Sequence, residues 1–169
     1  MVVLDSSILI KLFGQRVTGL EKKKLEYLVR TLEEARERII IPTPALAEYL
    51  ARAGEAAAGV LEQLRKRSVF YIAPFDQKAA VESALALNKD LTAGDKRGGS
   101  KAITWAKVKF DRQIVAIALA NGAAQIYSED DDIRRLAKKA GIRALSIADI
   151  DLPQSERQQH LFDDESPPK

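Results

Sequence analysis

The sequence predicts a three-layer α/β/α domain with a central parallel sheet of about five strands. Short apolar segments alternate with longer segments of helical periodicity, the pattern of a sheet covered by helices on both faces. The chain has 169 residues, the length of one domain. Its uninterrupted apolar runs are only a few residues long, whereas a membrane-spanning helix needs about 20. We therefore expect no membrane association.

In the N-terminal half, strands are predicted where aliphatic residues run without charge, and helices where apolar residues recur every three or four positions. Gly14 ends the first helix, and Pro42 ends the second strand. Thr43 offers an N-cap and Pro44 the first helical position of the helix that follows. In order, we predict a strand at 2–4, helices at 8–13 and 19–38, a strand at 39–41, helices at 44–52 and 55–67, and a strand at 69–72.

The C-terminal half continues this alternation. Glycines at 94, 98 and 99 predict a loop over 92–103, and Gly122 and Gly141 each close a helix. In order, we predict helices at 76–91 and 107–121, a strand at 125–127, a helix at 130–140 and a strand at 142–146.

Charge is divided unevenly along the chain. The formal net charge is +3, with −3 on residues 151–169 and +6 on residues 1–150. The last segment is polar, lacks periodicity and ends near two prolines, features typical of disordered termini. We therefore predict a folded domain at 1–150 and a disordered tail at 151–169.

Two absences restrict the chemistry. The chain has no cysteine, which excludes thiolate nucleophiles and zinc sites built on sulfur, and a single histidine, His160. Any enzymatic activity must therefore depend mainly on carboxylates. The N-terminal segment 1–10 has no basic region and carries Asp5, so it is not predicted to be a signal peptide, and we expect a cytoplasmic protein.

Four acids occupy positions that are otherwise apolar or that directly follow strands: Asp5, Glu48, Asp111 and Asp130. In a parallel sheet, Asp5 and Asp130 lie beyond the C-terminal ends of their strands, at the edge where open α/β sheets bind ligands. The helices that carry Glu48 and Asp111 have their N-terminal ends at the same edge. Because unpaired buried carboxylates are costly, the four acids need a shared partner, and a divalent cation such as Mg²⁺ or Mn²⁺ is the simplest.

Each acid also has a purely structural interpretation. Asp5 could cap the helix that begins at Ser6, and the acids at 129–132 could cap another. Asp111 could pair with Lys107, four residues earlier. Glu48 could pair with a buried base, although we expect no such partner four residues away on its own helix.

Four motifs occur in a fixed order over nearly all of residues 1–147: VLDSSILI (3–10), PTPALAE (42–48), DRQIVAIALANG (111–122) and YSEDDDI (127–133). Together they resemble the PIN-domain family of Mg²⁺/Mn²⁺-dependent ribonucleases. The resemblance implies that Asp5, Glu48, Asp111 and Asp130 form the catalytic metal site, with Asp132 as an accessory acid. Ser7 and Ser128 match its supporting polar positions. Ile133 departs from the family pattern, which usually has an aromatic residue there.

The resemblance implies cleavage of single-stranded or structured RNA by metal-activated water. Length and layout are similar to those of VapC-type toxins, which implies an antitoxin partner and a homodimer. A non-toxin PIN nuclease of RNA processing and a non-catalytic RNA- or protein-binding module are the alternatives. A phosphatase of the haloacid dehalogenase type would need an aspartate where Ser7 stands.

A basic segment precedes the third acid. Residues 94–112 contain six cations that we predict to bind RNA: Lys96, Arg97, Lys101, Lys107, Lys109 and Arg112. Trp105 and Phe110 lie among them, and one aromatic ring could stack on a base. The structural alternative is a solvated loop with Trp105 in the core. Near Gly94 the segment resembles a phosphate-binding P-loop, but its Ser and Lys are inverted and no strand precedes it.

Apolar residues on the helices at 19–38, 44–52 and 55–67 provide a physical reason to expect partners. They could exceed what one face of a five-stranded sheet can bury, leaving a groove for a second copy or an antitoxin. The alternative is that all of them belong to the core. The set comprises Leu20, Leu25, Leu28, Val29, Leu32, Leu46, Tyr49, Leu50, Val60, Leu61 and Leu64.

Overall fold

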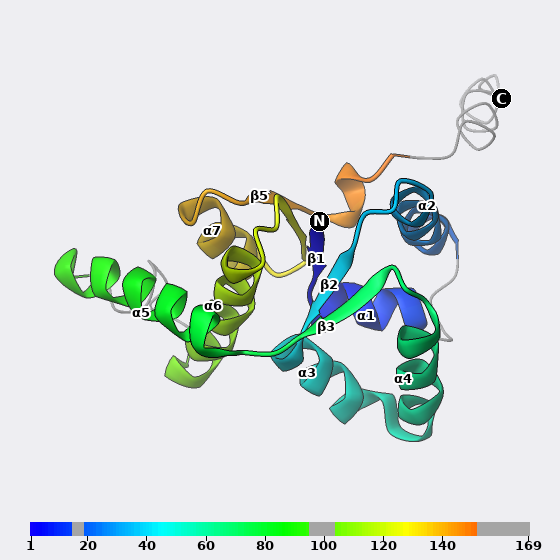
Figure 1. Ribbon diagram of the computed structural model, residues 1–169, viewed down its shortest axis with the longest axis horizontal. Helices are drawn as coiled ribbons and strands as arrows, with labels where there is room; N and C mark the ends of the chain where they lie inside the picture. Colours follow the sequence, from blue (N-terminus) through cyan, green and yellow to red (C-terminus); the bar gives the residue numbers. More distant parts are fainter. Residues whose placement is uncertain (15–18, 95–103, 152–169) are drawn as a thin grey trace, which may run out of the picture.

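Five parallel strands form a single central sheet (Figure 1). The computed structural model describes residues 1–14, 19–94 and 104–151, with the side chain of Trp105 left out. The strands follow the order β3-β2-β1-β4-β5 and comprise β1 (Val2–Leu4), β2 (Ile39–Pro42), β3 (Phe70–Ala73), β4 (Gln125–Tyr127) and β5 (Arg143–Leu145). The predicted fold class is therefore confirmed.

Strand β1 lies at the centre of the sheet and pairs with β2 and β4. Val3 is aligned with Ile40 on one side and with Ile126 on the other. All three side chains are fully buried, because helices cover both faces of the sheet. This explains why these aligned positions of the central strands are apolar.

Helices form the two outer layers. Figure 1 shows α1, α2 and α4 on one side of the sheet and α5, α6 and α7 on the other. Successive residues of β1 point to opposite faces, so Val2 and Leu4 pack in the first core and Val3 in the second. The helices are α1 (Ser6–Phe13), α2 (Leu20–Glu34), α3 (Thr43–Ala53), α4 (Ala57–Lys66), α5 (Gln77–Thr92), α6 (Trp105–Ala120) and α7 (Asp131–Lys139), with short 3₁₀ turns η1 (Gly54–Ala56) and η2 (Ile147–Asp149).

Several element boundaries differ from the predictions. Helix α2 ends at Glu34 rather than at residue 38, because the chain turns through Arg36, which has a φ of 56°. Thr43 is the first residue of α3 rather than its N-cap, and no side chain caps this helix. Helix α6 begins at Trp105, two residues earlier than predicted, because the side chain of Thr104 accepts a hydrogen bond from the Lys107 amide.

The apolar residues of α2, α3 and α4 are mostly core, so the structural alternative describes them better than an exposed groove. Leu25, Val29 and Leu64 are at most 2% exposed, and of the predicted set only Leu20 is largely exposed. Helix α5 instead carries exposed apolar side chains, among them Val81 and Leu85.

Within the described residues, no helix has both the length and the apolar character needed to cross a membrane. The segment 152–169, which makes up nearly all of the predicted tail, lies outside those residues. The division of the chain at residue 150 therefore stays a prediction.

Candidate metal centre

A pocket of about 710 Å³ opens at the edge of the sheet where the strands end, and four acids line it. Asp5 follows β1, Glu48 lies on α3, Asp111 on α6, and Asp130 immediately before α7. Parallel winding places all four of these segments at one edge. Residues separated by more than a hundred positions in the sequence thus share one cavity.

Asp5 is held by the start of its own helix and by a distant serine. Its Oδ1 accepts hydrogen bonds from the Ser7 hydroxyl at 2.7 Å and the Ile8 amide at 3.1 Å, so it also caps α1. Its Oδ2 accepts from the Ser128 hydroxyl at 2.5 Å. The side chain is almost fully buried, and burial raises the pKa of Asp5, while the hydrogen bonds from Ser128 and Ser7 act in the opposite direction.

The two serines also fix the loop between β4 and α7. The amide of Glu129 donates to the Ser7 hydroxyl, and the amide of Asp130 donates to the Ser128 hydroxyl, both at 2.9 Å. Asp5 and Asp130 are therefore positioned relative to each other by hydrogen bonds through Ser7 and Ser128.

Glu48 is more exposed than the sequence suggested, and it does have a basic partner. Its side chain is 47% exposed, and its Oε1 lies 2.9 Å from the guanidinium of Arg52, one helical turn later. The hydroxyl of Ser6 donates to its Oε2 at 2.8 Å. The expectation that Glu48 lacks a basic partner on its own helix was wrong, because Arg52 lies at the i+4 position.

Asp111 is buried and has a strongly raised pKa. It is 5% exposed, and its Oδ2 is buried without a hydrogen-bond partner. Burial raises the pKa of Asp111 to about 7, and the neighbouring charges of Asp130, Asp132 and Glu48 act in the same direction. Lys107 opposes this shift, but its Nζ lies 3.8 Å from Asp111 Oδ2.

The ammonium of Lys107 also contacts the two acids at the start of α7. It lies 2.8 Å from Asp130 Oδ2 and 3.1 Å from Asp132 Oδ2. Burial acts to raise the pKa of Asp130, but the hydrogen bonds from Lys107 and the Asp132 amide outweigh it and hold that pKa below its usual value. Burial likewise opposes the charge on Lys107, yet the hydrogen bonds to Asp130 and Asp132 raise its pKa above the usual value.

The family model of the PIN domain matches residues 2–139. The chain belongs to the PIN domain family. No protein of curated function matches it in sequence.

Several solved structures have the same fold as this PIN domain. VapBC2 from Rickettsia felis, bound to a DNA fragment from its promoter, gives a TM-score of 0.61 at 14% identity, covering 86% of this chain and 98% of that one. DNA-bound VapBC from Salmonella typhimurium gives 0.58 at 15% identity, covering 86% and 97%. VapC20 from Mycobacterium tuberculosis, a toxin that cleaves the sarcin–ricin loop, gives 0.53 at 16% identity, covering 84% and 96%.

The donor atoms that the acids of this PIN domain offer are of the type that a hard divalent cation prefers. All candidate donors are carboxylate oxygens, which Mg²⁺ and Mn²⁺ prefer, and the buried Asp111 Oδ2 would gain a partner. However, no three acidic side chains within residues 1–14, 19–94 and 104–151 lie close enough together to bind one ion as they stand. Asp111, Asp130 and Asp132 surround the ammonium of Lys107 instead.

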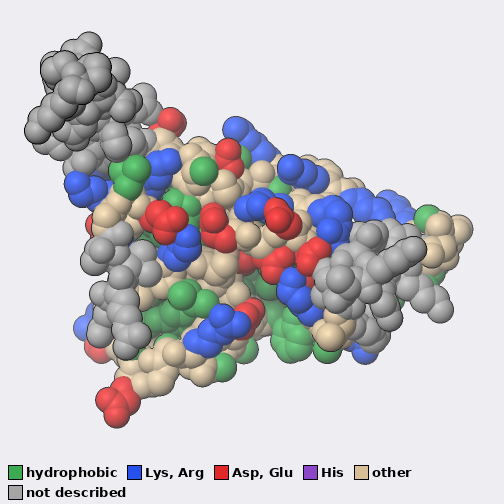
Figure 2. All heavy atoms as spheres, turned by 180° about the vertical axis from the view of Figure 1, so that it is seen from behind, with side chains coloured by type: hydrophobic (Ala, Val, Ile, Leu, Met, Phe, Trp, Pro, Cys, Tyr) green, Lys and Arg blue, Asp and Glu red, His purple; other side chains and the backbone are tan. Residues whose placement is uncertain are grey.

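Of the six cations predicted to bind RNA, the structure describes Lys107, Lys109 and Arg112, and their surroundings differ. Lys96, Arg97 and Lys101 lie outside the described residues, and Lys107 lies among the acids. Lys109 is exposed on α6, next to Phe110. Figure 2 shows acidic and basic side chains interspersed over one face of the molecule, without a wide field of one sign.

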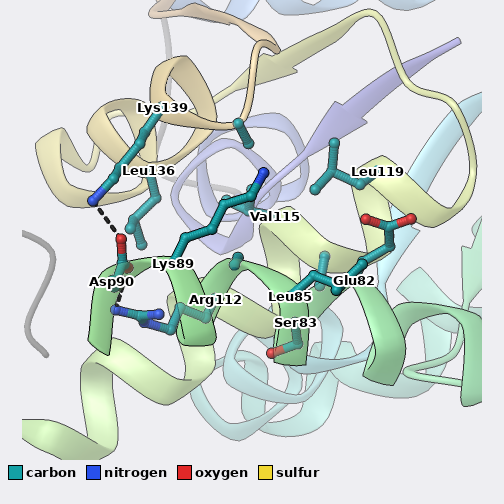
Figure 3. Close-up of a pocket in the computed structure, with 13 residues that line it drawn as sticks. Glu82, Ser83, Leu85, Lys89, Asp90, Arg112, Val115, Leu119, Leu136 and Lys139 are labelled. Atoms are coloured by element: carbon teal, nitrogen blue, oxygen red, sulfur yellow. Dashed lines mark hydrogen bonds and ion pairs between the residues drawn. The ribbon is translucent and has the colours of Figure 1, made fainter. Parts of the chain in front are cut away.

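Arg112 does not line the pocket of the four acids, and its contact with RNA stays a prediction. It is 7% exposed, and its guanidinium lies 2.7 Å from Asp90 Oδ2, in a second pocket between α5, α6 and α7 (Figure 3). Lys139 of α7 pairs with the other oxygen of Asp90. Asp90 of α5 thus forms ion pairs with Arg112 of α6 and Lys139 of α7, and these contacts link the three helices.

Sequence reasoning missed Ser6 and Arg52, which hold Glu48, and the central position of Lys107. The i+4 spacing of Glu48 with Arg52 is visible in the sequence and was the available signal. The contacts of Lys107 with Asp130 and Asp132 join α6 to α7, and no local spacing indicates them.

We expect the pH dependence of stability to depend on Asp111. Its pKa is 3.8 in the unfolded chain and about 7 in the folded domain, so the folded state binds more protons between these values. The contribution of Asp111 to stability therefore falls as pH rises from about 4 to about 7. Asp111→Asn removes this titrating group. The metal-free variant should therefore melt at a higher temperature than wild type at mildly alkaline pH, by roughly 2–4 °C per kcal/mol of stability gained.

Thermal unfolding followed by circular dichroism in EDTA, from mildly acidic to mildly alkaline pH, measures this effect. Asp131→Asn makes the same change at a side chain that is 90% exposed and serves as control. A pH dependence that is identical in Asp111→Asn and wild type would contradict the expectation.

Proposed function

We propose that this PIN domain is a metal-dependent endoribonuclease and the toxin of a toxin–antitoxin pair. The main support is the convergence of Asp5, Glu48, Asp111 and Asp130 from four separate segments on one pocket. Membership of the PIN domain family and the likeness of the fold to VapC toxins support the same function.

In this proposal the four acids, together with Asp132, hold Mg²⁺ or Mn²⁺. Such a cation lowers the pKa of water and polarises a phosphate group. Ser7, Ser128 and the Ile8 amide fix the orientation of Asp5 by three hydrogen bonds. Both lone pairs of Asp5 Oδ1 are then engaged, while Oδ2 keeps one lone pair for a ligand.

The central prediction concerns the acids. Asp5→Asn and Asp111→Asn should each reduce EDTA-sensitive cleavage of RNA more than about 100-fold, because each variant loses a charged ligand. The measurement is cleavage of a purified RNA with Mg²⁺ or Mn²⁺, together with circular dichroism to verify folding. The control Asp131→Asn carries the same substitution at an exposed side chain outside the pocket and should cleave normally. Equal activity of wild type and both pocket variants would refute the assignment.

Phe110 provides an aromatic surface for a base of the substrate. It lines the pocket of acids and is 56% exposed, so its ring is accessible to a base. Lys109 beside it and the cations Lys96, Arg97 and Lys101 supply the proposed charge for the phosphate backbone.

Phe110→Ala should weaken binding of single-stranded RNA by about 5- to 150-fold, since a stacked base is worth about 1–3 kcal/mol. Fluorescence anisotropy in the Asp111→Asn background measures affinity without cleavage. Phe75→Ala, an exposed phenylalanine outside the pocket, is the matched control. If Phe110→Ala binds RNA as tightly as the parent protein, the RNA does not stack on Phe110.

We also propose an antitoxin partner and a homodimer. The Rickettsia felis and Salmonella typhimurium neighbours are VapBC complexes, which favours a partner protein for this chain. A basic residue of such a partner could enter the pocket and neutralise its acids. For the dimer, Val81 and Leu85 offer an exposed apolar face, one helical turn apart on α5.

Light scattering of wild type and of Val81→Glu/Leu85→Glu tests the dimer. We expect a dimer for wild type and a monomer for the double variant, and a monomeric wild type at tens of micromolar would exclude it. For the antitoxin, co-expression with the adjacent reading frame should relieve growth arrest. Arrest that persists would count against that partner.

A further inference from the structure

Lys107 occupies the place where the acids of α6 and α7 converge. Its ammonium lies 2.8 Å from Asp130 Oδ2, 3.1 Å from Asp132 Oδ2 and 3.8 Å from Asp111 Oδ2. These three acids are candidate ligands of the metal centre. A cation that belongs to the chain itself therefore stands among carboxylates proposed for a divalent ion.

Two features of the fold place Lys107 among these acids: its spacing from Asp111 on α6 and the position of the start of α7. It precedes Asp111 by four residues on α6, so both side chains lie on the same face of the helix. Asp130 and Asp132 lie at the start of α7, where the amide of Asp132 donates to Asp130 Oδ1 at 2.8 Å. The contact of Lys107 with both helices is thus a feature of the tertiary fold.

We propose that Lys107 is a built-in competitor of the divalent metal for Asp111, Asp130 and Asp132. This inference rests on the proposed metal-dependent function. Lys107 and a divalent ion engage the same carboxylate oxygens, and their like charges repel strongly at such short range. The metal therefore binds only when the ammonium leaves, and its affinity is lowered by the contacts that Lys107 gives up.

Lysine is suited to such an exchange. Its ammonium is a compact charge on a flexible stem, without the rigid fork that holds an arginine on a carboxylate. The side chain of Lys107 is 42% exposed, so it can turn from the acids into solvent without crossing the protein interior. In the metal-free protein its charge also reduces the repulsion among the three acids.

Manganese binding by the full chain tests the inference, with free Mn²⁺ followed by electron paramagnetic resonance. Lys107→Met should bind Mn²⁺ roughly tenfold more tightly, or better, because the competing charge is gone. Lys107→Gln removes the charge but keeps a hydrogen-bond donor, and it should bind more tightly too. Lys66→Met makes the same substitution on α4, where the ammonium pairs with Glu62 at 2.7 Å, and it should match wild type.

Thermal unfolding provides an independent readout. Without metal, Lys107→Met should melt lower than wild type, because three acids lose their counter-charge, and saturating Mn²⁺ should raise its Tm more than it raises that of wild type. Lys107→Gln reports on the same competition if Lys107→Met does not fold.

Two results would overturn the inference in distinguishable ways. If wild type binds Mn²⁺ and cleaves RNA while the folded Lys107 variants bind no more tightly, the competition is absent and the proposed function stands. If folded wild type and variants all fail to bind Mn²⁺, both the assignment of the metal centre and the proposed competition are refuted.

Discussion

Negative charge buried at one edge of the sheet is the constraint on which the arrangement of this PIN domain depends. Asp5 and Asp111 are nearly inaccessible to water, so their charges must be met by groups of the protein or by a ligand. The carboxylate of Asp5 accepts hydrogen bonds from two serines and a backbone amide, and these bonds fix the start of α1 and the loop before α7. Among the described residues, Asp111 pairs with the ammonium of Lys107 at 3.8 Å, and burial raises its pKa to about 7.

Much of the fold could be predicted because a parallel sheet leaves a strong pattern in the sequence. Buried strands such as 39–41 and 125–127 are uninterrupted by charge, and the helices between them have a clear period. The gathering of the acids could be anticipated from topology alone, since the C-terminal ends of parallel strands share an edge. For Asp5, capping a helix and lining a pocket proved compatible, so the two interpretations were not true alternatives.

The features that could not be predicted depend on which residues, distant in the sequence, contact each other in the folded protein. Residues 107 and 112 belong to one basic segment of sequence, yet α6 directs them to different partners, Lys107 to the acids and Arg112 to Asp90. A count of charges along the chain cannot separate them. The exposure of Glu48 likewise follows from the placement of α3 at the rim of the pocket, which apolar neighbours in the sequence did not indicate.

The buried pair of Arg112 and Asp90 has a mechanical consequence for the residue before it. Asp111 and Arg112 are consecutive on α6, so their side chains leave the helix axis about 100° apart. A rotation of α6 that carried Asp111 toward water would draw Arg112 away from Asp90 and break this buried ion pair. The pair therefore acts as a stop against rotation of the helix, and Asp111 keeps its orientation in the pocket despite the cost of its burial.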